Sequence, residues 1–177
     1  MTNPTAPELV VNVRELLRSP GARKHVDLTW APAEAVGTPV AAVAPGSQVQ
    51  LAADIDHVVE GLLVSGTVRA AMACSCVRCL TEFSDAVAVD VRELFALDPA
   101  EAEDDGYAVA GDQLPLETMV RDALVLALPA APLHAPDCAG LCPTCGADRN
   151  TIDCGHDQAP VDQRWAALAE LQHPDPT

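Results

Sequence analysis

The sequence is poor in aromatic residues, in cations and in long apolar runs. Aromatic residues make up 3% of the 177 residues, so the core must be built from the aliphatic residues Val, Leu and Ala. One lysine, Lys24, and nine arginines stand against 26 acidic residues, which gives a formal net charge of −16 at pH 7. This balance opposes broad phosphate binding, which needs clustered positive charge, and it favours a basic protein partner.

No segment approaches the roughly 18–20 consecutive apolar residues that a membrane-spanning helix needs. The first apolar run, residues 9–11, is too short for a secretory signal and lacks a preceding basic region. We therefore expect a cytoplasmic protein with no membrane partner. Lasting disulfides are rare in that compartment, where cysteine pairs usually mean metal binding or redox chemistry. The odd total of seven cysteines also fits a disulfide framework poorly.

Catalytic motifs are absent from the sequence as well. The chain has no nucleophile elbow, Walker loop, H-E-x-x-H helix or G-x-G-x-x-G fingerprint. The acidic pair Asp104 and Asp105 lies in a predicted loop, with no signal of a general acid or base beside it. We expect a protein that is not an enzyme and takes no small-molecule substrate.

The cysteines carry the most informative pattern in the chain. Cys76 and Cys79 form one C-x2-C pair, and Cys142 and Cys145, followed by Gly146, form another. This spacing lets a tight turn point two sulfurs at one ion about 2.3 Å away. One such pair is a weak signal, but two in one chain strongly indicate a zinc protein.

Eight residues are candidate zinc ligands, enough for two closed tetrahedral sites. Such closed sites are structural, because catalysis needs an open position. In chain order the candidates are Cys76, Cys79, His134, Cys138, Cys142, Cys145, Cys154 and His156. We favour two sites formed by the first four and the last four, because this leaves no paired cysteine unused. Two alternatives stay open: one ribbon site built from the two C-x2-C pairs, and a local site built from the four cysteines between positions 138 and 154. Cys74 is assigned no role.

The apolar pattern predicts an α+β fold that is mostly antiparallel β-sheet with one packed helix. Alternating apolar and polar residues predict strands over 48–55, 62–73 and 83–94, with Gly66 at a bulge. The first C-x2-C pair then caps a β-hairpin, where zinc ribbons place a knuckle. Because this pair leads into a strand and not a helix, a thioredoxin-type redox site is disfavoured.

Helical spacing predicts the packed helix over residues 115–128, with Pro115 in its first turn. A strand and a short helix are expected over 9–19, and a flexible loop rich in proline and glycine over 31–46. The expected organisation is a core domain over 9–133 with an acidic loop over 98–113, a zinc-knuckle segment over 134–157, a C-terminal helix over 160–172, and flexible termini over 1–8 and 173–177.

Charge is distributed unevenly along the chain. Residues 98–112 hold six acidic residues and no basic one, whereas four of the ten basic residues, Arg14, Arg18, Arg23 and Lys24, lie close together near the N-terminus. The plain interpretation of both stretches is solvated surface. The sharper interpretations are that the acidic run attracts a basic protein and that the arginines contact a small anion or RNA.

Several short motifs follow one another in an order typical of one protein family. The most specific are Cys-Val-Arg-Cys-Leu at 76–80 and Gly-Leu-Cys-Pro-Thr-Cys-Gly at 140–146. The others are Val-Arg-Glu-Leu at 13–16, Pro-Gly at 20–21, Glu-Phe at 82–83, Leu-Glu-Thr-Met-Val-Arg-Asp at 116–122, Leu-Pro at 128–129, Pro-Leu at 132–133 and the closing stretch at 162–168. Together they resemble the YceD family of large ribosomal RNA subunit accumulation proteins, in its zinc-knuckle-containing form. Many members have a cysteine where this chain has His134.

The resemblance implies a role in processing or accumulation of large-subunit ribosomal RNA, with no catalytic residues. The first hypothesis is a non-catalytic assembly factor that binds this RNA or its assembly intermediate, with two structural zinc ions and phosphate contacts from Arg14, Arg18, Arg23 and Arg78. The second is an acidic adaptor that holds a basic ribosomal protein. A third, minor hypothesis is a redox or zinc sensor, because oxidation of zinc thiolates releases the metal.

Overall fold

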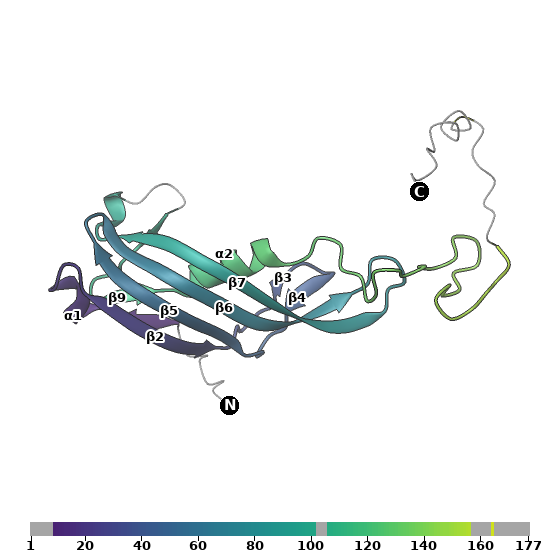
Figure 1. Cartoon of the computed structure of the whole chain (residues 1–177), viewed down its shortest axis with the longest axis horizontal. Coiled ribbons are helices and arrows are strands. Elements are labelled where there is room, and N and C mark those ends of the chain that lie inside the picture. Colours follow the sequence, from purple (N-terminus) through teal and green to yellow (C-terminus); the bar gives the residue numbers. More distant parts are fainter. Residues whose placement is uncertain (1–8, 102–105, 157–163, 165–177) are drawn as a thin grey trace, which may run out of the picture.

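The computed structural model describes residues 9–101, 106–156 and 164 of the chain. A long, twisted antiparallel sheet forms one layer, and α2 (Glu117–Ala127) lies along one of its faces (Figure 1). This architecture confirms the α+β class with a mostly antiparallel sheet and one packed helix.

The large sheet is built around its central strand β6. Its strand order is β2–β5–β6–β4–β3, and β7 pairs with the other side of β6 along nearly its whole length. The strands are β2 (Arg23–Trp30), β3 (Val36–Gly37), β4 (Ala41–Val43), β5 (Val49–Val58), β6 (Gly61–Ser75), β7 (Glu82–Ala96) and β8 (Tyr107–Ala108). Neighbouring strands are antiparallel, except that β8 runs parallel to β7.

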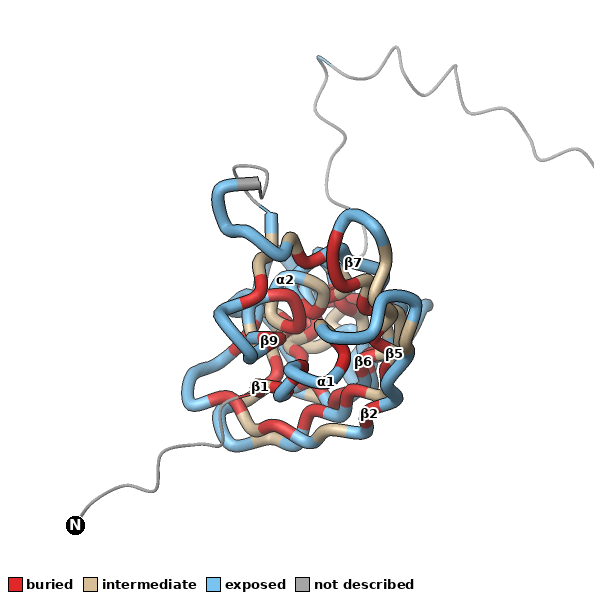
Figure 2. The backbone as a smooth tube through the Cα atoms, turned by 90° about the vertical axis from the view of Figure 1, so that its left-hand side faces the viewer, coloured by how far each residue is buried: buried red, intermediate tan, exposed pale blue. Residues whose placement is uncertain are grey.

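A two-stranded sheet joins the N-terminal part of the chain to the start of α2. Its strands, β1 (Val10–Asn12) and β9 (Gln113–Pro115), are antiparallel. The short helix α1 (Arg14–Leu17) follows β1 and buries Leu16. Figure 2 shows β1, β9 and α2 on one side of the molecule and β5 and β6 on the other, with buried stretches in both layers. The core therefore lies on one face of the large sheet.

The predicted alternation of apolar and polar residues is present in both long strands that flank β6. On β5, Val49, Leu51, Ala53 and Ile55 are buried, and the residues between them are at least partly exposed. The valine-rich centre of β7 alternates in the same way, with Val91 buried. A strand covered on one face only has this period of two.

The helix α2 lies within the range predicted for it, and its buried residues Met119, Val120 and Leu124 form the apolar stripe. The sequence predicts Pro115 in the first helical turn, and this prediction is wrong. Pro115 is the last residue of β9 and pairs with Val10. Proline is tolerated at the end of an edge strand as well as at a helix start, so its presence does not separate the two.

One prediction of irregular structure is wrong, and one strand was not predicted at all. Residues 31–46, expected to be a flexible loop, contain β3 and β4, and Val43 of β4 is fully buried. These strands are short, so they depend on pairing within the sheet and leave almost no periodic signal. The strand β2 was not expected from the sequence. Its charged first half, which includes His25, hides an alternation in which Val26 and Trp30 are buried.

Gly66 does not form the expected bulge. It pairs with Ala53 on β5 and with Val91 on β7 in unbroken register. A Cβ atom at this position would lie 2.6 Å from the Ala53 Cβ. Glycine is therefore needed here for close approach of a neighbouring strand, which is the other reason for a glycine inside a strand.

The expected acidic loop over residues 98–113 is only partly irregular. It contains the 3-10 helix η1 (Pro99–Glu101) and β8. Tyr107 of β8 stacks on Phe95 of β7, with ring centroids 5.2 Å apart. This aromatic contact holds β8 against β7 of the large sheet, shortly before the chain enters β9 of the two-stranded sheet.

Some predictions fall on residues that the structure does not describe. The C-terminal helix over 160–172 lies outside the described residues except at Arg164, and so do the flexible termini over 1–8 and 173–177. Among the described residues, no helix is long and apolar enough to cross a membrane.

Candidate metal centres

The β6–β7 hairpin extends beyond the core and ends in the first C-x2-C turn (Figure 1). The last strand pair is Ser75 with Glu82. Beyond it, the backbone N–H of Cys76 donates to Thr81 O at 2.9 Å, and that of Leu80 donates to Cys76 O at 2.8 Å. Leu80 closes the turn with a positive φ of 62°. Both cysteine side chains of this turn are buried.

The chain returns to the same turn after α2. The backbone N–H of Val77 donates to Pro132 O at 3.0 Å, which holds the returning segment against the hairpin. The segment brings two further candidate residues to the two cysteines of the turn. We call this set the hairpin-tip group: Cys76, Cys79, His134 and Cys138, whose ligand atoms all lie within 4.8 Å of one another.

The distances in the hairpin-tip group fit a tetrahedral zinc ion. Sulfur at about 2.3 Å and nitrogen at about 2.0 Å from zinc leave two sulfurs about 3.8 Å apart, and a sulfur and a nitrogen about 3.5 Å apart. Cys76 Sγ lies 3.7 Å from Cys138 Sγ, and Cys79 Sγ lies 3.2 Å from His134 Nδ1. A shift of a few tenths of an ångström brings the second pair to the tetrahedral value.

A second set of candidate residues lies further along the chain, beyond the end of the sheet (Figure 1). We call it the C-terminal group: Cys142, Cys145, Cys154 and His156, whose ligand atoms also lie within 4.8 Å of one another. The backbone N–H of Gly146 donates to Cys142 O at 2.8 Å, and Gly146 has a positive φ of 73°. This turn is the second C-x2-C knuckle, and it is less buried than the first because Cys145 is exposed.

Hydrogen bonds lower the pKa of one thiol in each group. Burial raises the pKa of Cys76, but hydrogen bonds with His134 and with the backbone N–H of Cys79 outweigh this effect and lower the pKa to about 5. In the C-terminal group, backbone N–H groups, that of Cys145 foremost, lower the pKa of Cys142 to about 6. Both side chains are thus favoured as thiolates, the form of cysteine that binds metals.

The structure divides the eight candidates into the two sets of four that the sequence analysis favours. The two C-x2-C pairs lie in different groups, whereas the alternative of one ribbon site needs them together. Cys138 lies with the hairpin cysteines and not with Cys142, whereas the alternative of a local site needs these two in one group. Cys74 belongs to neither group and is buried on β6 opposite Phe83. That these residues bind zinc stays a prediction.

The four arginines predicted to contact RNA lie at two separate places. Arg14 and Arg18 are exposed on and just after α1, and Arg23 begins β2 at the same end of the sheet. Arg78 lies in the hairpin-tip turn, at the opposite end (Figure 1). The Arg14 Nε lies 3.7 Å from a carboxylate oxygen of Asp112. The four side chains therefore do not form one patch.

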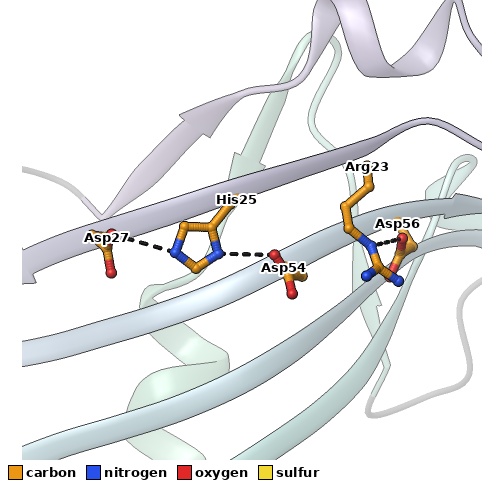
Figure 3. A network of polar contacts seen from close by, with 5 residues as sticks. All are labelled: Arg23, His25, Asp27, Asp54 and Asp56. Atoms are coloured by element: carbon orange, nitrogen blue, oxygen red, sulfur yellow. Dashed lines mark hydrogen bonds and ion pairs between the residues drawn. The ribbon is translucent and has the colours of Figure 1, made fainter.

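Arg23 belongs to a row of ion pairs on β2 and β5 (Figure 3). Its guanidinium donates to the two carboxylate oxygens of Asp56 at 2.6 and 3.1 Å. His25 lies between Asp54, 2.8 Å from Nδ1, and Asp27, 3.3 Å from Nε2. The hydrogen bond to Asp54 is the main cause that raises the pKa of His25. Carboxylates thus neutralise Arg23, and His25 when it is protonated, which weakens this face as an anion site.

Asn150 was not marked by the sequence patterns, although it lies in sequence between Cys145 and Cys154 of the C-terminal group. Its side-chain N–H donates to Cys138 Sγ, with Nδ2 and Sγ 3.4 Å apart. Arg78 also contacts Cys138, because its Nη1 donates a hydrogen bond to Cys138 O at 2.9 Å. Spacing rules do not mark such residues, because they orient a ligand through hydrogen bonds and are not ligands themselves.

Comparison with known proteins yields a family match over the whole region that holds these groups. The family model described as "Large ribosomal RNA subunit accumulation protein YceD" matches residues 64–172, more than half of the chain. The chain belongs to the YceD family. The matched range includes all eight residues of the hairpin-tip and C-terminal groups of this YceD-family chain.

Mycobacterial proteins are similar to this YceD-family chain over nearly its full length. Uncharacterized protein Rv2926c of Mycobacterium tuberculosis is 36% identical over 176 residues, which cover 96% of this chain and 84% of the relative. Uncharacterized protein ML1660 of Mycobacterium leprae is 34% identical over 174 residues, covering 94% of this chain and 79% of the relative. No solved structure matches the chain.

Proposed function

We propose that this YceD-family chain is a non-catalytic, zinc-binding factor for processing and accumulation of large-subunit ribosomal RNA, and so for ribosome assembly in the cytoplasm. The family match is the observation that carries the proposal. Its partner is the RNA itself or an assembly intermediate that contains it. The two Cys/His groups support the dependence on metal.

Two structural zinc ions are proposed, one in each group. Each group offers three thiols and one imidazole. This donor set suits zinc, whose structural sites are tetrahedral and made of cysteine and histidine. Four protein donors leave no open position for water or substrate, so the ions hold the chain in place and do not take part in catalysis.

Metal binding explains how residues 134–156 can keep a fixed structure. Only Cys138, Gly140 and Cys142 are buried in this segment. No apolar side chain other than cysteine is therefore buried there, and a hydrophobic core cannot stabilise it. In small segments of this kind, the free energy of metal binding serves as the free energy of folding.

RNA contact is proposed through a few exposed arginines and not through a broad basic surface. Arg14 and Arg18 at one end and Arg78 at the other have exposed side chains. Arg23 contributes least, because its guanidinium is paired with Asp56. Few phosphate contacts predict a shallow dependence of RNA affinity on salt, since the slope follows the number of neutralised phosphates.

A second candidate function is that of an adaptor that holds a basic ribosomal protein before delivery. The observation that favours it is the formal net charge of −16. Such a surface attracts basic proteins and repels nucleic acid at long range. Charge reversal of the acidic residues within 101–105 separates the two functions, because loss of protein binding with unchanged RNA binding favours the adaptor.

Zinc content tests the metal part of the proposal. We expect two zinc ions per chain in the parent, one in Cys76→Ser and one in Cys142→Ser when zinc is in excess. Cys74→Ser is the matched control and retains two, because Cys74 lies outside both groups. A parent chain purified without chelator that holds no zinc contradicts the proposal.

Depletion of the chain in cells tests the RNA part. We expect mature large-subunit ribosomal RNA to fall relative to small-subunit RNA. Expression of the parent or of Cys74→Ser restores the ratio, whereas the double variant Cys76→Ser/Cys142→Ser does not. An unchanged ratio after complete depletion overturns the role in RNA accumulation.

A further inference from the structure

Only three residues separate the two groups, and this part of the chain lies directly on the hairpin-tip turn. This linking segment, residues 138–141, begins with the last residue of the hairpin-tip group and ends just before the C-terminal group. The backbone N–H of Leu141 donates to Arg78 O at 3.0 Å, and Arg78 Nη1 donates to Cys138 O at 2.9 Å. A Cβ atom at Gly140 would lie 3.1 Å from Arg78 O, so glycine permits this close approach.

The linking segment is at the same time one side of a small hairpin that carries the C-terminal group. Leu141 forms an antiparallel bridge with Asp148. The backbone N–H of Arg149 donates to Gly140 O at 2.9 Å, and that of Cys142 donates to Ala147 O at 2.8 Å. The base of this hairpin is therefore bonded to Arg78, while its tip contains the second C-x2-C turn.

Asn150 completes the connection from the opposite side of the small hairpin. Its Oδ1 accepts the backbone N–H of Ala139 at 2.8 Å, while Nδ2 lies 2.6 Å from Asp148 Oδ1 and 3.4 Å from Cys138 Sγ. The amide is thus held by three partners in one orientation, with an N–H directed at the sulfur. Asn150 lies in sequence between the members of the C-terminal group, but its side chain contacts a member of the hairpin-tip group.

We propose that the two groups form one coupled metal-binding unit, in which Asn150 positions Cys138 for the hairpin-tip ion. This inference rests on the zinc binding proposed above. Folding of the C-terminal group sets the place of Asn150, and the N–H of Asn150 stabilises the Cys138 thiolate that binds the other ion. Because such coupling is reciprocal, each ion raises the affinity of the chain for the other. Asn150 is a positioning residue and not a ligand.

The size of the effect follows from the behaviour of residues that hydrogen-bond to metal ligands. Loss of such a partner typically weakens metal affinity by about 10- to 100-fold. We expect Asn150→Ala to weaken the affinity of the hairpin-tip group for its ion by this factor. Asn150→Asp is expected to do the same, because it removes the N–H donor but keeps an oxygen that can accept from Ala139. Thr151→Ala is the matched control, since among the described residues Thr151 Oγ1 bonds to Asp148 O and to neither group.

The experiment measures the dissociation constant of each ion by chelator competition, with ¹¹³Cd NMR of the same variants to assign the two ions. The Cys142→Ser spectrum identifies the signal of the hairpin-tip ion. We expect Cys142→Ser to weaken binding of this ion about as much as Asn150→Ala does. The double variant Asn150→Ala/Cys142→Ser is expected to bind it no more weakly than either single variant, because all three lose the same interaction. Circular dichroism of the sheet verifies that each variant is folded.

Three outcomes overturn the coupling. The first is a folded Asn150→Ala chain that binds the hairpin-tip ion within twofold of the parent. The second is a Cys142→Ser chain with unchanged affinity at the hairpin-tip group. The third is an additive loss in the double variant, which would mean that Asn150 does not carry the connection. In each case the parent still holds two zinc ions and the proposed function stands, whereas a parent without zinc removes both proposals.

Discussion

Removal of zinc is expected to unfold residues 134–156 and to leave the sheet folded. The buried residues form two separate clusters. The larger cluster spans the sheet and α2 and includes Leu51, Ile55 and Leu124. The smaller one contains only cysteines of the hairpin-tip group as its buried members. A chelator therefore acts on one cluster and has no direct effect on the other.

The magnitude follows from comparing metal binding with the entropy of ordering the segment. Structural zinc contributes about 10–16 kcal/mol in small zinc-binding peptides. Fixing one residue costs about 1–2 kcal/mol, so one ion offsets the ordering of roughly ten residues. Two ions match a segment of this length. Without them, almost no apolar burial remains to oppose the entropy, and the segment is expected to be unfolded in nearly all molecules.

Hydrogen exchange followed by mass spectrometry is the assay. After chelation, the backbone amides of Leu141, Cys142 and Gly146, which are hydrogen-bonded in the metal-binding segment, are expected to exchange at the rate of an unfolded chain. Amides of β5 and β6 keep their protection, and added zinc restores that of the segment. Persistent protection over 138–149 in chains shown to contain no metal refutes this reasoning, and so does simultaneous loss of protection in the sheet.

Three further predictions concern the fold and its surface. Leu124→Ala is expected to lower the free energy of unfolding in urea by about 2–5 kcal/mol, because Leu124 is fully buried. The control Leu126→Ala, whose side chain is 87% exposed, is expected to change it by less than about 0.5 kcal/mol, and equal effects would contradict the orientation of α2 on the sheet. Gly66→Ala is expected to cost about 1–3 kcal/mol in the same assay, because its Cβ would overlap the neighbouring strand; an unchanged midpoint contradicts the register. NMR titration is expected to give His25 a pKa above 6.5 that falls in Asp54→Asn. Because the pKa is raised in the folded state, the contribution of protonated His25 to the free energy of unfolding is fully present below pH 6.5 and is lost as the pH rises through the folded pKa. A measured pKa at or below 6.5 refutes the ion pair.

Period-two alternation predicted β5 and β7 because one face of the sheet is covered and the other is open to water. The alternation in β2 was overlooked, because its first residues are charged and the inward set begins with the exposed Lys24, so that only the second half, with Val26, Leu28 and Trp30, marks the buried face. β3 and β4 are too short for any period. Pairing with β6, which stabilises β4, is a long-range contact that local sequence does not encode.

The two C-x2-C turns were accessible from the sequence because cysteine spacing is itself a geometric constraint, whereas the division into two groups of four was one of three alternatives that the spacing left open. Two residues between cysteines require a turn, and the strands on either side of Cys76 and Cys79 place that turn at a hairpin end. The contacts of Arg78 and Asn150 were not accessible in this way. They depend on where the chain returns after α2, and polar residues of these types are common in loops of any function.

The length of the β6–β7 hairpin has a consequence for any partner. From Leu63, which pairs with Asp56 near Arg23, to Ser75 at the hairpin end, β6 advances by roughly 40 Å at about 3.3 Å per residue. The arginines near α1 and the arginine at the metal-binding end are therefore several nanometres apart. An oligonucleotide of a few nucleotides can therefore occupy one end only, whereas a partner that contacts both ends at once has to span a distance of this order, the length of roughly twelve base pairs of a duplex.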